Sequence, residues 1–230
     1  MHTFYVDNCA IGADEARHAF RVLRLKKGDE VACLDGGRRY LARIAEISDS
    51  GGAVELIQEL PSNEPPVCIT VYQGLPKSEK LEFLAQKLTE LGVSRLVPVR
   101  MERSIAKADG DRRMDRLARI AREAVKQCRR AAPMEITPPM TWKEAVSDME
   151  KRELMIVPWE NASATRMADV HKQNPDARDI GILIGPEGGI SQGEIDAAPA
   201  RPVLLGPRIL RAETASVTAA VLAMSMWGDI

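Results

Sequence analysis

Two glycine-rich turns near the carboxy-terminal end carry the residues best suited to ligand chemistry. In GILIGPEGGISQGE, the apolar run Ile182–Ile184 ends at Gly185 and a Pro-Glu-Gly-Gly string follows. In VLLGPRILRAETAS, the run Val203–Leu205 ends at Gly206, about twenty residues further on. Glycine lets main-chain amides and carbonyls approach a ligand closely. Because ligands bind at the loops after strands in open α/β sheets, the turns predict one cleft built from two backbone loops.

The spacing alone leaves the ligand open. Neither Lys-Ser nor Lys-Thr follows these glycines, and the G-x-G-x-x-G spacing is absent, so the common phosphate and dinucleotide motifs are missing. The same pattern is equally compatible with two tight strand-to-helix turns that bind nothing.

The elements around these turns predict an α/β domain. Lys77–Leu91 repeats apolar residues every three or four positions, which indicates a helix, and Gly92 ends it. Short apolar runs on either side predict buried strands of a parallel sheet at Val67–Leu75, Arg95–Val99 and Glu153–Trp159. Ala212–Trp227 is apolar on all sides, so we expect it to be buried by the chain or covered by a second subunit.

The first sixty residues predict a smaller β-rich unit. Strand-like runs joined by glycine turns, typical of a small barrel, occur at Thr3–Val6, Glu30–Leu34, Tyr40–Ile47 and Ala53–Leu60. A helix over Asp14–Leu23, capped by Asp14, interrupts them. The proline-rich string PSNEPP at Pro61–Pro66 indicates a linker, so we place two domains at residues 1–64 and 65–230. The unit's Arg and Lys residues suit either an ordinary solvated face or an RNA contact.

A helix predicted over Arg112–Arg130 has a one-sided basic stripe. Residues 100 to 130 contain eleven basic and five acidic residues, an excess of six positive charges. At 100° per residue the basic side chains share one arc and Leu117, Ala121 and Val125 lie opposite. The stripe matches the line of charge that RNA phosphates require, and it is also compatible with an ordinary amphipathic surface helix.

Bulk composition is that of a globular protein with no strong charge bias. The 230 residues are 45% hydrophobic and 28% charged, with a formal net charge of −1. The four cysteines form no C-x-x-C pair, which disfavours a zinc site and a disulfide scaffold. No signal peptide or membrane-spanning run is evident. We therefore expect a cytoplasmic protein with no metal and no membrane partner.

Three ordered motifs resemble the signatures of one enzyme family. GPEGGIS with Glu194, LGPRILRAETA, and the upstream Lys77, Glu79 and Lys80 followed by QKLTELGV resemble the RsmE-type ribosomal RNA uridine-N3 methyltransferases of the SPOUT superfamily. His18 and VLRLKKGDEV resemble the family's amino-terminal pattern. Ile190 stands where phenylalanine is usual, and Ala212 where threonine is common; the latter removes one hydroxyl.

The resemblance implies a fold and a cofactor. The fold is α/β: a knotted parallel-sheet SPOUT domain preceded by a small PUA-like β-barrel that engages RNA, with a homodimer formed through the carboxy-terminal domain. The cofactor is S-adenosylmethionine. Its binding residues, carried over by position, are Ile184, Gly185, Pro186, Glu187, Gly188, Gly189, Leu204, Leu205, Gly206, Ile209, Leu210 and Thr214.

The implied reaction is methyl transfer to N3 of a uridine in 16S ribosomal RNA of the small ribosomal subunit. Uracil N3 carries a proton, so catalysis needs a base and stabilisation of the charge that spreads to O2 and O4. The catalytic candidates are Arg211, Glu213 and Glu90, each of which could instead form a structural ion pair. The RNA-binding candidates are His18, Arg21, Arg24, Arg103, Arg119, Arg122, Lys126 and Arg130. Methylation of another base or a ribose, or RNA binding without catalysis, are the alternatives.

Overall fold

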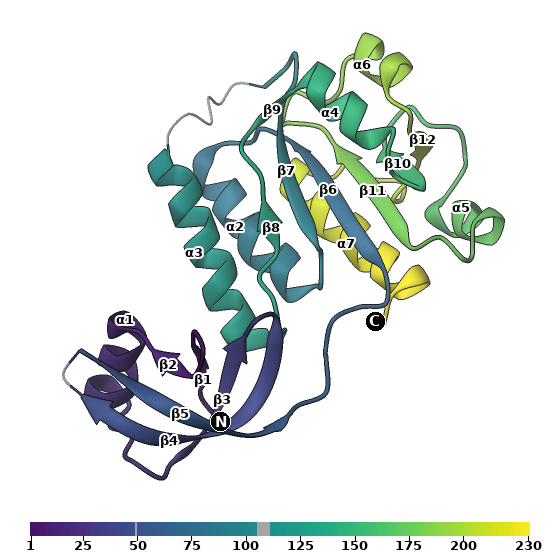
Figure 1. Cartoon of the computed structure of the whole chain (residues 1–230). Helices are drawn as coiled ribbons and strands as arrows, with labels where there is room; N and C mark the ends of the chain where they lie inside the picture. The colour runs from purple at the N-terminus through teal and green to yellow at the C-terminus, as the bar shows by residue number, and fades with distance from the viewer. Residues whose placement is uncertain (49, 105–110) are drawn as a thin grey trace. The chain divides into compact units, whose positions relative to one another are not determined.

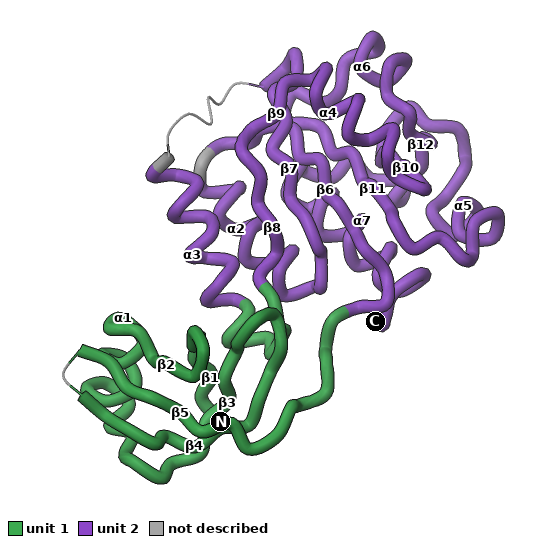
Figure 2. The backbone as a smooth tube through the Cα atoms, viewed as in Figure 1, with its two compact units in different colours: residues 1–64, 125–132 green, residues 65–124, 133–230 purple. Residues whose placement is uncertain are grey.

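The structure, a computed structural model, describes residues 1–48, 50–104 and 111–230. Its contacts divide the chain into two compact units (Figure 2). Unit 1 contains Met1–Glu64 and Val125–Ala132, and unit 2 contains Pro65–Ala124 and Pro133–Ile230. We retain the domains 1–64 and 65–230 as a proposal. Among the described residues, no helix has both the length and the apolar character needed to cross a bilayer.

Unit 1 is a curled five-stranded sheet in the order β1-β3-β4-β5-β2. The strands are β1 (Thr3–Tyr5), β2 (Ala10–Ile11), β3 (Glu30–Asp35), β4 (Arg38–Ser48) and β5 (Gly51–Glu59). Strands β3, β4 and β5 form an antiparallel meander, and two register shifts interrupt the pairing of β4 with β5. Phe4, Val31, Cys33, Ala42 and Ile44 form the buried core. The predicted β-rich unit is confirmed.

The helical segment of unit 1 differs from its prediction. It begins as α1 (Ala13–Ala16) and continues as η1 (Arg17–Val22), a π-helix. The predicted cap at Asp14 is wrong, because the N-cap position is Gly12 and Asp14 lies in the first turn. The acidic side chain of Asp14 still stabilises the helix from the first turn, because it faces the positive end of the helix dipole.

Glu64 and Arg130 form a half-buried ion pair within unit 1. Arg130 Nη2 lies 2.7 Å from Glu64 Oε2, and the amide of Ala131 donates to Glu64 Oε1 at 2.8 Å. Burial raises the pKa of Glu64, but the hydrogen bond and charge of Arg130 and the backbone amides lower it further, so the net pKa lies below its usual value. The pair therefore stabilises the fold only while Glu64 is ionised.

Glu64→Ala is expected to lower the free energy of unfolding by about 3 kcal/mol, because the buried guanidinium and two amides lose this carboxylate. Because the folded-state pKa is depressed, the difference from wild type should be full near neutral pH and shrink as the pH falls through the pKa of Glu64. Denaturant unfolding at several pH values measures it. Glu59→Ala, which removes the exposed partner of Arg38, is the control and should cost no more than about 1 kcal/mol. Equal losses in the two variants would contradict this account.

Unit 2 contains a parallel sheet in the order β12-β10-β11-β6-β7-β8, with β9 also pairing with β7. Its strands are β6 (Cys68–Gly74), β7 (Arg95–Arg100), β8 (Glu135–Ile136), β9 (Met140–Thr141), β10 (Leu154–Pro158), β11 (Asp179–Ile184) and β12 (Arg201–Val203). Its helices are α2 (Ser78–Glu90), α3 (Asp111–Cys128), α4 (Trp142–Met149), α5 (Met167–Gln173), α6 (Gln192–Ala197) and α7 (Ala212–Trp227). Every strand pair is parallel. The predicted α/β fold with a parallel sheet is confirmed.

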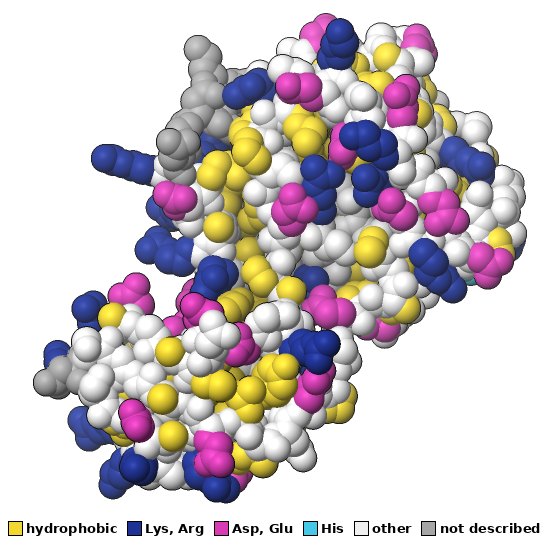
Figure 3. Space-filling model, viewed as in Figure 1, with side chains coloured by type: hydrophobic (Ala, Val, Ile, Leu, Met, Phe, Trp, Pro, Cys, Tyr) yellow, Lys and Arg dark blue, Asp and Glu magenta, His cyan; other side chains and the backbone are white. Residues whose placement is uncertain are grey.

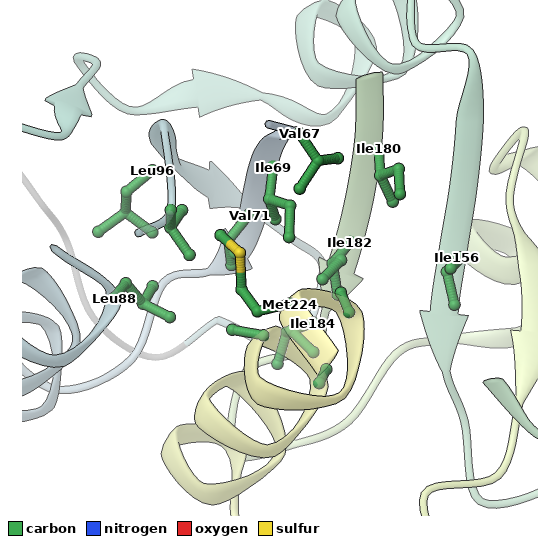
Figure 4. Close-up of a cluster of buried hydrophobic side chains, with 14 of the residues drawn as sticks. Val67, Ile69, Val71, Leu88, Leu96, Ile156, Ile180, Ile182, Ile184 and Met224 are labelled. Atoms are coloured by element: carbon green, nitrogen blue, oxygen red, sulfur yellow. The ribbon is translucent and has the colours of Figure 1, made fainter. Parts of the chain in front are cut away.

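Helices cover both faces of this sheet (Figure 1). Alternation along the strands sends Ile69, Val71, Ile180 and Ile182 to the face covered by α2, α5 and α7. Figure 4 shows this cluster, with Met224 of α7 reaching in from the helix side. Intervening residues such as Tyr72 and Leu183 pack against α4 and α6 on the other face. Because the strands are parallel, the loops after β6, β7, β10, β11 and β12 all lie at one edge of the sheet.

Candidate active site

The Gly-Pro-Glu-Gly-Gly loop follows β11 and folds back as a tight turn. The amide of Gly189 donates to the carbonyl of Pro186 at 2.9 Å, and Gly189 has a φ of +75°. A Cβ on Gly185 would lie 2.7 Å from Cγ1 of Ile190, so only glycine fits there. Glu194, buried at 6% exposure, caps α6 through Ser191 and accepts from the amide of Glu102 at 2.8 Å. The far end of the loop is therefore fixed to the backbone just after β7, while its near end continues from β11.

The second loop follows β12 and leads into α7. The amide of Leu204 donates to the carbonyl of Thr165 at 2.9 Å, which holds the start of the loop. Gly206 has a φ of +152°, a conformation that side chains disfavour, although a Cβ there would meet nothing within 4 Å. The need for glycine at this position therefore comes from the backbone and not from crowding.

The two loops line one cavity, as the glycine turns predicted. It has a volume of about 430 Å³, and its walls are Ile184–Ile190 from the first loop and Ile209–Ala212 from the second. It is also lined by Pro158 at the end of β10, by Glu160 just after it, by Lys80 of α2 and by Ala215 of α7. A smaller hollow of about 80 Å³ adjoins it, sharing Pro158 and Ile209 and reaching Leu204, Leu205 and Gly206.

Lys80 joins the two loops electrostatically. Its Nζ lies 3.2 Å from Glu187 Oε1 of the first loop and 2.9 Å from Glu213 Oε2 at the start of α7. The amide of Lys77 also donates to Glu187 at 3.3 Å. The hydrogen bond from Lys80 to Glu213 raises the pKa of Lys80. Burial raises the pKa of Glu213, but the bond to Lys80 and the charges of Lys80 and Arg211 lower it more, so its net pKa is depressed.

The structure separates the three catalytic candidates. Arg211 lines the cavity with an exposed side chain. Glu213 is not part of the lining, but it contacts Lys80, which is. Glu90 instead pairs with Lys87 at 3.0 Å, ten residues along α2 from Lys80. At a rise of 1.5 Å per residue, this places Glu90 about 15 Å further from the cavity edge. The geometry argues against Glu90 as a base, because α2 runs away from the carboxyl ends of the strands.

Among the cofactor candidates, only Thr214 lines neither hollow. Its side chain is exposed on α7, one turn past the loop. Conversely, sequence reasoning left out Lys80 and Glu160 as site residues. Lys80 belongs to the quoted motif, and Glu160 stands where β10 ends, so position at a strand end was the available signal for Glu160.

The RNA-binding candidates fall into three groups. Arg103 donates to the carbonyl of Gly188 at 3.2 Å, at the cavity loop. Arg119 and Arg122 are exposed on α3, and His18, Arg21 and Arg24 are exposed on unit 1. Lys126 and Arg130, in contrast, bind Glu15 and Glu64 within unit 1. Arg130 is only 5% exposed, which argues against a direct phosphate contact.

The basic helix itself agrees with its prediction on the apolar side. Leu117, Ala121 and Val125 are buried, and Figure 3 shows Lys and Arg side chains along the α3 side of unit 2. The helix ends at Cys128, earlier than predicted, because Arg129 has a φ of +65°. Lys107 and Asp109, which enter the charge excess, lie outside the described residues.

Comparison with known families identifies the chain. The sequence pattern of the family described as the RNA methyltransferase domain matches residues 63–224. The chain belongs to this RNA methyltransferase family. A second pattern, the RNA methyltransferase PUA domain, matches residues 11–57. The cavity thus lies in the region matched by the methyltransferase domain, and most of the curled sheet lies in the region matched by the PUA domain.

Three relatives of this RNA methyltransferase match it over nearly the whole length of both chains. It is 31% identical to the ribosomal RNA small subunit methyltransferase E of Aquifex aeolicus, covering 98% of this chain and 100% of that protein. A crystal structure of the methyltransferase E of Neisseria gonorrhoeae bound to S-adenosyl methionine is 28% identical, with a TM-score of 0.90, and covers 100% of this chain and 99% of the other. A methyltransferase of Legionella pneumophila, solved with the same cofactor, is 27% identical with a TM-score of 0.88, covering 100% and 99%.

Proposed function

We propose that this RNA methyltransferase transfers a methyl group from S-adenosylmethionine to N3 of a uridine in 16S ribosomal RNA of the small subunit. The observation that carries the proposal is the cavity between the two glycine loops of a chain that matches a cofactor-bound methyltransferase E over its whole length. Another base or a ribose could be methylated at the same cavity, so the position of the methyl group on the nucleoside needs a direct test.

The cavity fits the cofactor in size and lining. Its volume of about 430 Å³ lies within the range of small-molecule sites, about 300–1,000 Å³. Gly185 allows the tight turn of the first loop and Gly206 the positive φ of the second. The turns built in this way let main-chain groups bind the adenine and the amino acid part. When bound, S-adenosylmethionine supplies the methyl group and its own leaving group.

The chain supplies a base and a cation for the uracil. The net pKa of Glu213 is depressed. Its carboxylate is therefore ionised near neutral pH and can accept the N3 proton, although the same shift makes it a weaker base. Arg211 lines the cavity, and its guanidinium can stabilise negative charge on O2 or O4. Glu213 therefore takes the role of proton acceptor and Arg211 that of charge stabiliser.

The exposed cations of α3 supply a surface for RNA phosphates. Arg119→Glu is expected to weaken RNA binding about tenfold and to reduce the salt slope by about one, because one phosphate contact is lost. Filter binding from 50 to 300 mM salt measures both quantities. Lys172→Glu, an exposed cation of α5, is the control and should bind as wild type does. A wild-type salt slope in Arg119→Glu would remove α3 from the RNA surface.

Two further features belong to the proposal. We place the protein in the cytoplasm and expect a homodimer through the carboxy-terminal domain. Two observations are consistent with a second copy. Ile209 beside the second loop is 86% exposed, and Val217, Leu222 and Met226 of α7 are only partly buried. Light scattering at several protein concentrations tests the dimer.

The deciding experiment maps modified nucleosides in 16S ribosomal RNA by mass spectrometry, after incubation with protein and S-adenosylmethionine. We expect one new 3-methyluridine. A methyl group on another base or on a ribose would overturn the assigned position. RNA binding with neither saturable cofactor binding nor methylation would leave the non-catalytic alternative.

A further inference from the structure

A second cavity lies within unit 1, between the helical segment and the end of β4. Its volume is about 320 Å³, and it is lined by Ala16, Arg17, Phe20, Arg21, Ile47 and Ser48. Figure 1 shows the end of β4 beside the helical turns of η1, which follow α1. Of these residues only Arg21 was singled out from the sequence for RNA binding, so the cavity itself needs an explanation.

Two unopposed cations stand at this cavity. Arg17 and Arg21 are exposed and lie four positions apart on η1. Within the described part of the chain, neither guanidinium has a hydrogen-bond or ion-pair partner, and no acidic side chain lines the cavity. Arg38 and Arg43 of the same unit are, in contrast, paired with glutamates. The cavity therefore favours an anionic ligand with more than one charge or with a chain of charges.

The rest of the lining is apolar and partly aromatic. Phe20 is half-buried, and its ring tip stands directly on the backbone at Gly52, where an added Cβ would lie 2.9 Å from Phe20 Cζ. Ile47 is 44% exposed, although such a residue is normally buried. An aromatic ring and an exposed aliphatic side chain together offer a platform for a flat apolar group.

A nucleotide combines these two properties, because it carries a flat base and a phosphate on each side. We propose that this cavity binds one unpaired nucleotide of the RNA substrate, with the base against Phe20 and Ile47 and the flanking phosphates on Arg17 and Arg21. Single-stranded RNA is commonly held in this way, by stacking on an aromatic residue and by cations along the backbone. The inference rests on the proposed function, since it requires that RNA is the substrate.

The variants Phe20→Leu and Arg17→Gln/Arg21→Gln separate the two parts of the site. Phe20→Leu keeps an apolar side chain over Gly52 and should weaken binding of a 16S ribosomal RNA transcript about tenfold, with an unchanged salt slope. The double variant should reduce the salt slope by about two. Arg38→Gln, about 30 Å along β4 from Ile47, is the matched control and should behave as wild type. Thermal unfolding of each variant reports whether unit 1 stays folded.

Photo-crosslinking provides a readout that does not depend on mutation. RNA containing 4-thiouridine should crosslink to the peptides that contain Phe20 or Ile47. Wild-type affinity in both variants, or crosslinks only elsewhere, would overturn the nucleotide site. Equal competition by polyglutamate and by an RNA oligonucleotide would assign the cavity to acidic peptides instead, and would also overturn it.

Failure of this inference can be told from failure of the proposed function. If wild-type protein methylates 16S ribosomal RNA and the variants bind that RNA equally well, only the nucleotide site is wrong. If wild-type protein neither binds nor methylates the RNA, the proposed function itself fails. Titration with S-adenosylmethionine should give the same affinity for every variant, because none of the substituted residues lines the cavity of unit 2.

Discussion

Gly185→Val is expected to reduce the affinity for S-adenosylmethionine at least about 100-fold, which corresponds to about 2.7 kcal/mol. The first carbon of any side chain at this position would lie 2.7 Å from Ile190 Cγ1 and 3.2 Å from the backbone at Gly189 and Ile190. The contacts are with the loop's own turn, so the turn must open to admit valine. Its main-chain groups would then leave the positions from which they line the cavity.

Gly193→Val is the matched control for this substitution. Gly193 lies in α6, close in sequence to the same loop, and an added Cβ there would meet nothing within 4 Å. We expect it to bind the cofactor with wild-type affinity in isothermal titration calorimetry. Tight binding by Gly185→Val would show that the cofactor does not lie against the first loop, and would refute the proposed site.

The sequence alone predicted the strands and the two loops because their signals are local. Buried parallel strands such as β11 appear as short branched apolar runs, and Gly185 marks the point where that run ends. Carboxyl ends of parallel strands share one edge of the sheet, so a common cleft followed from strand polarity alone. The structure adds different reasons for the two glycines: crowding at Gly185 and backbone conformation at Gly206.

Pairings between distant residues were outside the reach of sequence patterns. Arg130 fits the basic arc of the helix predicted over Arg112–Arg130, yet it is buried against Glu64, which precedes it by 66 residues. Glu90 lies within the conspicuous QKLTELGV string, yet the direction of α2 brings Lys80 to the cavity. The switch from α1 to a π-helix at Arg17 leaves no periodic signal in six residues. In each case three-dimensional packing, and not local propensity, determines where the side chain lies or which type of helix forms.

Lys80 determines the charge state of the active site. It is the cation that holds Glu187 and Glu213 together, at 3.2 and 2.9 Å, although the two glutamates belong to different loops. Without it, two carboxylates would face each other without this shared cation, so the loops would separate or one carboxylate would become protonated. Separation of the loops would displace Glu213, and protonation of Glu213 would remove the ionised carboxylate that accepts the N3 proton.

Lys80→Met is therefore expected to lower kcat for methyl transfer about 100-fold, within the range that a positioned general base contributes. The pKa of Glu213 should rise once the hydrogen bond and charge of Lys80 are lost. Because a carboxylate base works only when ionised, the acid limb of the pH–rate profile should move to higher pH. Lys80→Arg, which keeps the charge, should restore part of the rate and return the acid limb toward its wild-type position.

Lys87→Met provides the control on the same helix. Lys87 is also paired with a glutamate, Glu90, but it lies two turns away from the cavity. Its loss should leave both kcat and the pH profile unchanged, although helix stability falls slightly. If Lys80→Met lowered kcat with no movement of the acid limb, Lys80 would hold the loops in place without setting the charge of Glu213. If Lys87→Met reproduced the loss, the base would have to be sought at Glu90 after all.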